Sequence, residues 1–367
     1  MSNIPYNYQN YDIIIKRPHN VSIISATLFK KTTGLNSNME LTIKPYDSNF
    51  EKQWDSFIEK ESLNGTFLQS RNFLNYHPKE RFKDHSLIVL KGTNSIIALI
   101  PACEINEEGN KILYSHIGST FGGIIVNQNS YNIKHIEEII KKLESYCIDN
   151  KFNEIILKNS SALFCKDRMD LIDYFLFKNN YNYYDELSFY VDCKKLPEDI
   201  LSAFSSGRRR DYRYSLKNNL VFKKLELDNE ITDFYNLLLG NLKKFDKKPV
   251  HSLGEILEFK NIRLTDIVDF YGAYHQNSML AGTMVFKFYK QVFHTQYLAS
   301  DQTKLSLFPM EFLNTNLIRV AKEQGYDYFS FGISTEDHGK VLNEGLALFK
   351  EGFGASYCVN RTYNKKL

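Results

Sequence analysis

The sequence predicts an α/β fold in which one domain is repeated along the chain. The main observation is a repeated order of elements: a hairpin, a strand, a loop, a long helix and a closing strand occur twice. The copies are about 180 residues apart, which is close to one domain length. The chain has 367 residues and is therefore long enough for two domains with separate hydrophobic cores.

The first domain is expected over 39–194, after residues 1–38. That first segment has no sustained hydrophobic period, and we expect it to be a dispensable extension outside the folded unit. Apolar periodicity and turn residues predict six elements in the domain: a strand at 41–46, a helix near 48–61, a strand pair at 86–102 with a G-T-N-S turn, a strand at 111–116, a helix at about 133–149 and a strand at 152–159.

The second domain is expected over 195–367. It opens with a basic segment at 196–219 and an amphipathic helical region at about 229–260, and the repeated order follows. A helix at about 309–324 has Pro309 in its first turn and Gly325 as its cap. The other elements of this copy are a hairpin at 269–286, a strand at 291–299, a loop at 300–306 and a strand at 326–331.

The composition is that of a globular protein, with 43% hydrophobic and 24% charged residues. A net charge of +3 argues against a protein that coats nucleic acid, and we expect no DNA partner. No apolar run reaches the roughly 18 residues of a membrane span, and no signal-peptide core is visible at the N-terminus. We therefore expect a cytoplasmic protein.

The sequence lacks the motifs of several common enzyme classes. It contains no G-x-S-x-G, H-E-x-x-H or phosphate-binding G-x-x-x-x-G-K-[ST] motif. Its histidines have no metal-ligand spacing, so we expect no metal. The five cysteines contain no C-x-x-C pair, and we expect Cys147 to pack in the core on the apolar stripe of its helix.

A basic helix is predicted at the entry to the second domain, within S-S-G-R-R-R-D-Y-R-Y-S-L-K. Ser205 or Ser206 caps it, and Arg209, Arg213 and Lys217 recur at i, i+4 as a cationic stripe. Guanidinium groups at a helix start suit phosphate oxygens. The alternative is a solvated surface face.

Two further features are candidate binding elements. In the loop G-S-T-F-G-G, Gly122 and Gly123 allow the backbone to approach a ligand; a plain turn is the alternative. Lys350 lies among apolar residues, which suggests a partly buried cation that needs an oxygen partner; an exposed lysine at a helix end is the alternative.

The C-terminal region resembles a known signature. The run F-G-I-S-T, then Gly345 and L-F-K-E-G-F-G-A, resembles the FemA/FemX-like branch of the GNAT acyltransferase superfamily, which includes bacterial BioF2-like (type 6) acetyltransferase domains. The matching residues are Phe331, Gly332, Ser334, Thr335, Phe349, Lys350, Phe353 and Gly354. The resemblance covers about 39–367 and implies tandem GNAT-like (α+β) domains, each a mixed, mainly antiparallel sheet flanked by helices.

The resemblance implies an N-acyltransferase that moves an acyl group, most simply acetyl, from acyl-CoA to an amine. The acceptor would be a small or nucleotide-linked amine, such as an amino sugar or a precursor in cell-envelope or polysaccharide biosynthesis. One alternative is Fem-type transfer of an amino acid from aminoacyl-tRNA to a peptidoglycan precursor, with tRNA as a partner. The other is a non-catalytic binding module on the same fold.

Roles follow for individual residues. Lys350 would stabilise charge on the acyl or leaving-group oxygen, and Glu336, Asp337 or His338 would receive the amine proton. The substrate-binding candidates are Ser334, Thr335, Gly122, Gly123, Arg209, Arg210 and Arg213, with the three arginines on a substrate phosphate.

The sequence departs from the family pattern at three places. Ser330 replaces the usual aspartate of F-D-F-G. The loop 298–310 has no glycine, so the usual pyrophosphate-binding motif is absent. The coiled-coil arm of some tRNA-using members is also missing.

Overall fold

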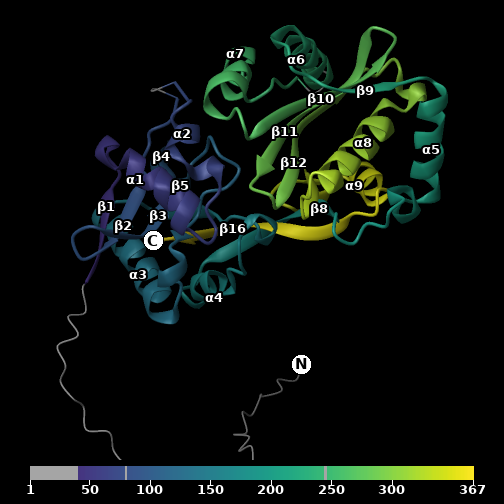
Figure 1. Ribbon diagram of the computed structural model, residues 1–367. Helices are drawn as coiled ribbons and strands as arrows, with labels where there is room; N and C mark the ends of the chain where they lie inside the picture. Colours follow the sequence, from purple (N-terminus) through teal and green to yellow (C-terminus); the bar gives the residue numbers. More distant parts are fainter. Residues whose placement is uncertain (1–39, 79–80, 244–245) are drawn as a thin grey trace, which may run out of the picture. The chain divides into compact units, whose positions relative to one another are not determined.

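The computed structural model describes residues 40–78, 81–243 and 246–367 (Figure 1). The predicted extension 1–38 lies outside the described residues. None of the helices in these described ranges is both long and apolar enough to cross a membrane.

The first half contains the predicted elements and several more. The first helix, α1 (Glu51–Ser56), continues as one π-helical turn, Phe57–Glu61. Trp54 and Phe57 on this segment are buried. The helices and strands of this half are β1 (Leu41–Pro45), α1 (Glu51–Ser56), α2 (Arg71–Leu74), β2 (Leu87–Lys91), β3 (Ser95–Ile100), β4 (Ala102–Glu107), β5 (Asn110–Ser115), β6 (Ile125–Val126), α3 (Ile133–Asp149), β7 (Glu154–Lys158), α4 (Asp170–Lys178) and β8 (Asn182–Asp192).

The second half begins with the predicted basic helix, capped by Ser205, whose hydroxyl accepts a hydrogen bond from the Arg208 N–H. Its helices and strands are α5 (Ser206–Lys217), β9 (Val221–Lys224), α6 (Asp228–Lys243), α7 (Leu253–Glu258), which continues as a π-helical turn (Phe259–Arg263), β10 (Val268–His275), β11 (Ser278–Phe288), β12 (Val292–Ser300), α8 (Pro309–Glu323), β13 (Tyr328–Ile333), β14 (Thr335–Glu336), β15 (Val341–Leu342), α9 (Glu344–Glu351) and β16 (Ser356–Lys366).

The predicted repeat is confirmed by the pairing of the strands. In the first half β5 pairs in parallel with β7, and the long helix α3 connects them. In the second half β12 pairs in parallel with β13, and α8 connects them. The other pairs are antiparallel. Each half therefore has a mixed, mainly antiparallel sheet with one parallel pair.

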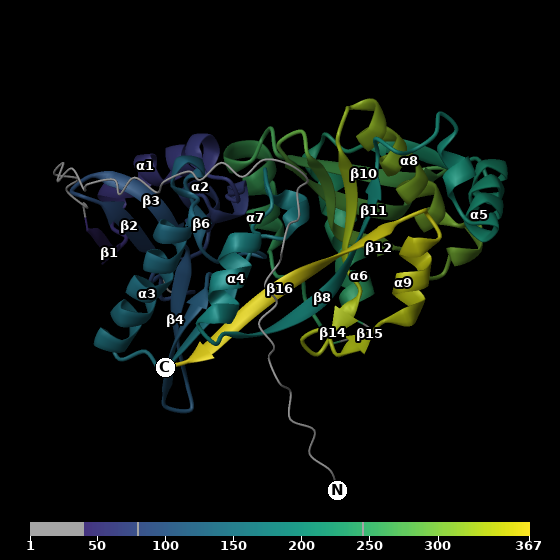
Figure 2. The same cartoon turned by 90° about the horizontal axis from the view of Figure 1, so that it is seen from below.

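One large sheet extends through both halves. Its strand order is β4-β5-β7-β16-β8-β13-β12-β11-β10-β9, and a smaller sheet in the first half has the order β1-β2-β3-β6. The last strand, β16, lies between β7 and β8, so Figure 2 shows β8 and β16 running from one half to the other. The boundary expected between 194 and 195 stays a prediction.

Five elements of the first half were not predicted: α2, β4, β6, α4 and β8. The residues of β3 and β4 read as one apolar strand because only Pro101 separates them. At this residue the chain leaves the smaller sheet and enters the larger one. A proline cannot donate to a strand ladder, and it marks this change of sheet.

Each half has a core against its long helix. Cys147 is fully buried in the core of α3, as predicted, and Leu313 and Leu317 of α8 are fully buried in the core of the second half. All five cysteines are free.

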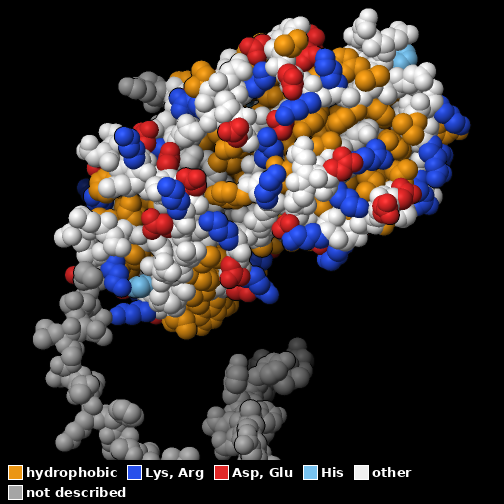
Figure 3. Space-filling view, in the orientation of Figure 1, with side chains coloured by type: hydrophobic (Ala, Val, Ile, Leu, Met, Phe, Trp, Pro, Cys, Tyr) orange, Lys and Arg blue, Asp and Glu red, His pale blue; other side chains and the backbone are white. Residues whose placement is uncertain are grey.

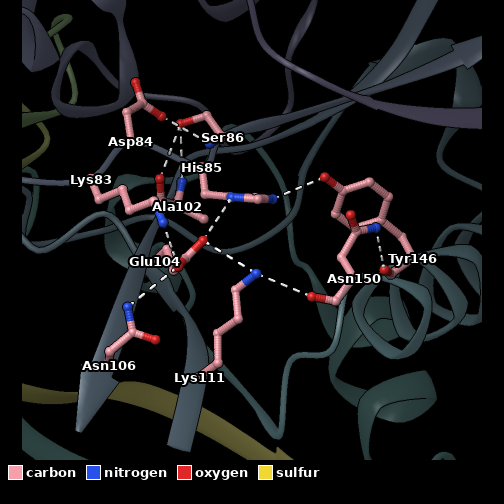
Figure 4. A network of polar contacts seen from close by, with 10 residues as sticks. All are labelled: Lys83, Asp84, His85, Ser86, Ala102, Glu104, Asn106, Lys111, Tyr146 and Asn150. Atoms are coloured by element: carbon pink, nitrogen blue, oxygen red, sulfur yellow. Dashed lines mark hydrogen bonds and ion pairs between the residues drawn. The ribbon is translucent and has the colours of Figure 1, made fainter.

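A polar network joins the edge of the large sheet to the C-terminal end of α3 (Figure 4). The Glu104 carboxylate on β4 lies 2.6 Å from the Lys83 ammonium, 3.4 Å from that of Lys111 and 3.5 Å from the His85 ring. The other ring nitrogen of His85 lies 2.9 Å from the Tyr146 hydroxyl on α3. These contacts fix α3 against β4 and β5, and with them the start of the loop that follows β5.

Candidate functional site

A cavity of about 510 Å³ lies at the carboxyl ends of the two parallel strand pairs. Pairing of β5 with β7 ends at Tyr114 and Ile156, and pairing of β12 with β13 ends at His294 and Ser330. The chain just beyond these points lines the cavity. Its polar lining consists of 118–120, Lys158, Asn159, Glu186, Ser188, 294–297, Ser330, Gly332 and 360–362. The site therefore lies where the two halves meet.

Strands β7, β16 and β8 form one side of the cavity. Lys158 on β7 pairs with Thr362 on β16, and Glu186 on β8 pairs with Asn360. Alternate side chains of a strand share one face, so Asn360 and Thr362 lie on the same face of β16 between the two charged residues. Burial lowers the pKa of the Lys158 ammonium, and the nearby Glu186 carboxylate raises it.

His294 is one of two histidines that line the cavity; the other is His251. His294 lies on β12 at the last residue paired with β13, and its Nδ1 is 3.0 Å from the Ser330 hydroxyl. Burial lowers the pKa of His294 to about 4; the nearby Lys350 charge lowers it too, whereas a hydrogen bond with Gln296 raises it. His294 is therefore neutral at pH 7. Ser330, which stands in the place of the family's usual aspartate, gives it a neutral partner.

Aromatic residues form the opposite walls. Near one end, the His251 ring lies 2.7 Å from the Tyr297 hydroxyl. A concave cavity that combines aromatic walls with polar groups is typical of sites for small molecules. The aromatic wall residues are Phe73, Phe121, Phe164, Phe286 and Phe288.

The F-G-I-S-T run at 331–335, called the signature loop below, contributes Phe331, Gly332 and Ile333 to the cavity lining. Gly332 has a φ of +73°, which glycine adopts readily, at an irregularity in the pairing of β13 with β8. Lys350 on α9 is 3% exposed, and its Nζ donates to the carbonyls of Gly332, at 3.0 Å, and Ile333, at 2.6 Å. Burial lowers the pKa of Lys350 to about 7. Within the described part of the chain, no carboxylate pairs with this ammonium.

Ser334 and Thr335 follow directly on the same loop. The backbone N–H of Ser334 donates to the Leu187 carbonyl at 2.9 Å, which joins the loop to β8. The hydroxyls of Ser334 and Thr335 are buried and have no hydrogen-bond partner among the described residues. Their assignment to substrate binding stays a prediction.

Glu336, Asp337 and His338 lie in an exposed hairpin formed by β14 and β15. The His338 ring is 4.7 Å from the ring of Tyr184 on β8. None of the three lines the cavity, so a role as proton acceptor there stays a prediction that requires a different position of the hairpin.

Gly122 and Gly123 end the loop that lines the cavity. Their N–H groups are already bonded inside the protein: Gly122 donates to the Lys158 carbonyl at 2.8 Å, and Gly123 donates to the Ser115 hydroxyl at 2.9 Å. A Cβ at Gly123 would lie 2.4 Å from the Asn159 amide oxygen. The glycines thus allow close packing of the loop against the end of β7, and their contact with substrate stays a prediction.

The predicted arginines lie on α5, outside the cavity, at the edge where Figure 3 shows Lys and Arg side chains. Arg209 donates to the Phe204 carbonyl, and Arg210 pairs with Asp211 at 2.9 Å. Arg213 is exposed and has no hydrogen bond or ion pair with any residue that the structure describes. The structure does not bring these arginines together with Lys350 or with the cavity.

Helix N-termini suit phosphates, which makes the N-terminus of α8 the candidate site for a diphosphate such as that of CoA. Glu311 in the first turn carries a carboxylate that accepts from Arg208 at 2.6 Å and from its own N–H. Phe308, just before the helix, has a φ of +54°, and its N–H donates to the Leu305 carbonyl. A diphosphate at this end would meet the Glu311 carboxylate, so the residues present do not fit one.

Three cavity residues were missed in the sequence: Lys158, Glu186 and His294. Lys158 and His294 each interrupt an apolar strand with a polar residue, which was the available signal. Glu186 lies in β8, which was not predicted at all. Across residues 40–78, 81–243 and 246–367, no group of three or more His, Cys, Asp or Glu side chains is placed to hold a metal ion.

The fold and the cavity were compared with known proteins. No family model matches the sequence, and no curated protein matches it. Solved structures do match this chain. One is the structure of FemX, which aligns with a TM-score of 0.64 and 11% identity over 89% of this chain and 97% of that chain. A tandem GNAT protein from the clavulanic acid biosynthesis pathway has a TM-score of 0.52 and 10% identity over 89% and 98%. This chain has the tandem GNAT fold.

A third structure extends the comparison. L-PGS from Bacillus licheniformis has a TM-score of 0.54 and 13% identity over 86% of this chain and 91% of its own. At these identities the likeness concerns the tandem GNAT fold alone. It confirms the fold class and the FemX-like resemblance expected from the signature.

Proposed function

We propose that this protein is an N-acyltransferase and that the acyl group is transferred to an amine in the cavity between the two halves. The observation that carries the proposal is the neutral His294, which lines the same cavity as Lys158 and Glu186 where both parallel strand pairs end. Direct transfer between two bound substrates needs alignment, an acceptor for the amine proton and stabilisation of the oxyanion.

His294 is the proposed proton acceptor. In the tautomer whose Nδ1–H donates to the Ser330 hydroxyl, Nε2 carries the lone pair that can take a proton. The amine must first lose one proton from its ammonium form; its nitrogen then bonds to the acyl carbon as the bond to the leaving sulfur or oxygen breaks. The second amine proton passes to His294, and the leaving group takes up a proton. One proton is released overall.

Lys350 is proposed to act through the backbone. Its ammonium holds the Gly332 and Ile333 carbonyls, and both residues line the cavity. In this arrangement it positions the signature loop. A direct role at the acyl or leaving-group oxygen would require its Nζ to exchange one carbonyl for substrate.

From the family resemblance alone, the donor is proposed to be acyl-CoA, most simply acetyl-CoA, with its diphosphate bound away from the N-terminus of α8. The acceptor is proposed to be a small or nucleotide-linked amine such as an amino sugar or envelope precursor. A second candidate is transfer from aminoacyl-tRNA. It is favoured by Glu311, whose carboxylate occupies the helix end where the diphosphate of CoA would be expected. An aminoacyl ester has no diphosphate that this helix N-terminus would have to bind.

A donor screen tests the proposal. Purified protein is mixed with an acyl-CoA or an aminoacyl-tRNA, together with amino sugars, amino acids and nucleotide-linked amines, and amide products are detected by mass spectrometry. We expect an amide with one donor class. Ligand uptake in calorimetry without any amide from any pair would instead support a non-catalytic binding module.

A further inference from the structure

Two opposite charges on one side of the cavity have no hydrogen-bond or ion-pair partner among the residues that the structure describes. The Lys158 ammonium and the Glu186 carboxylate both line the cavity, yet within the described ranges neither forms a hydrogen bond or an ion pair. The two charges do interact, because the Glu186 carboxylate raises the pKa of the Lys158 ammonium. Arg361, which also lines the cavity, is by contrast paired: it forms two bonds of 2.7 Å with Asp185.

Their places in the sheet set their separation. Strand β16 lies between β7 and β8, with Lys158 opposite Thr362 and Glu186 opposite Asn360. The two backbones are therefore about 10 Å apart across the strands and about 7 Å apart along them. Both residues line the cavity, and the gap between them suits a molecule with a charge at each end.

Polar groups of the cavity lining are only partly satisfied. The amide oxygen of Asn360 is buried and has no hydrogen-bond partner among the described residues, and the same holds for the amide oxygen of Asn159. Both residues line the cavity. A buried acceptor without a partner is costly, and an N–H donor on a ligand would relieve that cost.

We propose that the cavity binds a free amino acid as a zwitterion, with its carboxylate on Lys158 and its ammonium on Glu186. The inference rests on the proposed function, in which this amino acid is the amine acceptor. Its ammonium donates to Glu186 and to the Asn360 oxygen, and its side chain faces the aromatic wall. Glu186 takes the first proton from the ammonium, which leaves the amine free to attack.

The charge pattern separates this acceptor from other amines. An amino sugar has an ammonium but no carboxylate, so it would leave Lys158 unpaired. The amino acid of an aminoacyl ester has likewise lost its carboxylate. Only a ligand with both charges pairs both residues, and a buried lysine left unpaired weakens binding.

Calorimetry on the full chain tests the inference without any acyl donor. The probes are the common free L-amino acids, followed by the amide and the N-acetyl form of each that binds. We expect at least one free amino acid to bind, and each modified form to bind about 10- to 100-fold more weakly, because each lacks one charge-assisted contact.

Variants assign each end of the ligand. Lys158→Met should weaken binding of the free amino acid but not of its amide, and Glu186→Gln should weaken binding of the free amino acid but not of its N-acetyl form. Lys366→Met is the matched control, since Lys366 is exposed and outside the cavity. Melting curves check that the variants fold, and the modified ligands test the wild type independently.

Three outcomes would overturn the inference: no binding by any amino acid at millimolar concentration, equal binding of a free amino acid and its amide, or unchanged affinity in both cavity variants. Turnover of an amine without a carboxylate, as fast as any amino acid, would also overturn it and leave the proposed function intact. Binding of a free amino acid without turnover of any amine would keep the inference and overturn the proposed function.

Discussion

Lys350 is a buried ammonium held by two carbonyls, and its titration should be visible in the stability of the protein. Burial lowers its pKa from 10.5 to about 7. The unfolded chain keeps this proton up to about pH 10.5, whereas the folded chain loses it near pH 7. Between these values the unfolded state binds more protons, so a rise in pH favours the folded state.

The size of the effect follows from the lowered pKa. At about 1.4 kcal/mol for each unit of pKa, the full effect is about 5 kcal/mol. Most titrating groups are common to wild type and Lys350→Met, so the difference between the two isolates this lysine. The free energy of unfolding of wild type should rise relative to the variant by about 2–3 kcal/mol between about pH 7.5 and about pH 9.5.

Guanidinium unfolding at several pH values measures this difference. Fluorescence reports the single tryptophan, Trp54, which is fully buried, and circular dichroism follows the whole chain. The exposed Lys366→Met should show no such dependence on pH. A difference between wild type and Lys350→Met that stays constant from about pH 7.5 to about pH 9.5 would refute the reasoning.

Two further predictions concern α5 and the β14–β15 hairpin. Replacement of Arg209 and Arg213 by Gln should raise the KM of a phosphate-bearing substrate by about 10- to 100-fold per arginine at low salt, and less at high salt, if they bind its phosphate. The control is Arg168→Gln, at an exposed arginine outside the cavity, and an unchanged KM in the α5 variant would leave α5 as a surface helix. Gly339→Ala should destabilise the fold by about 1–3 kcal/mol, because Gly339 has a φ of +81° and a Cβ there would lie 1.9 Å from the Asp185 carbonyl oxygen. An unchanged melting temperature would show that the hairpin moves aside.

Much of the fold could be predicted because its signals are local. The apolar stripe of α3, and Pro309 and Gly325 at the ends of α8, depend only on neighbouring residues; Gly325 has the expected positive φ of +78°. The loop 118–123 and the burial of Lys350 were predicted from glycines and apolar neighbours in the same way.

The cavity could not be predicted because it depends on pairing between distant strands. Strand β16 comes last in the chain, yet it lies between β7 and β8 and thereby brings Asn360 between Lys158 and Glu186. No local pattern encodes that position. His294 is similar: its low pKa comes from burial and from Lys350, which is far along the sequence.

The polar residues that the sequence did emphasise have mainly structural contacts. Gly122 and Gly123 use their N–H groups within the protein, and the Lys350 ammonium holds two carbonyls. A signature is recognised by the residues that shape a loop, and the groups that face the cavity belong to other strands.

The most direct measurement of the central claim is single-turnover amide formation by His294→Gln, with the donor and acceptor found in the screen. If His294 accepts the amine proton in the cavity, the rate should fall by about 100- to 10,000-fold with little change in KM. The pKa of about 4 means that this loss should be the same at pH 6 and pH 8. His275→Gln, outside the cavity, is the control. A rate within about twofold of wild type would contradict chemistry at this site.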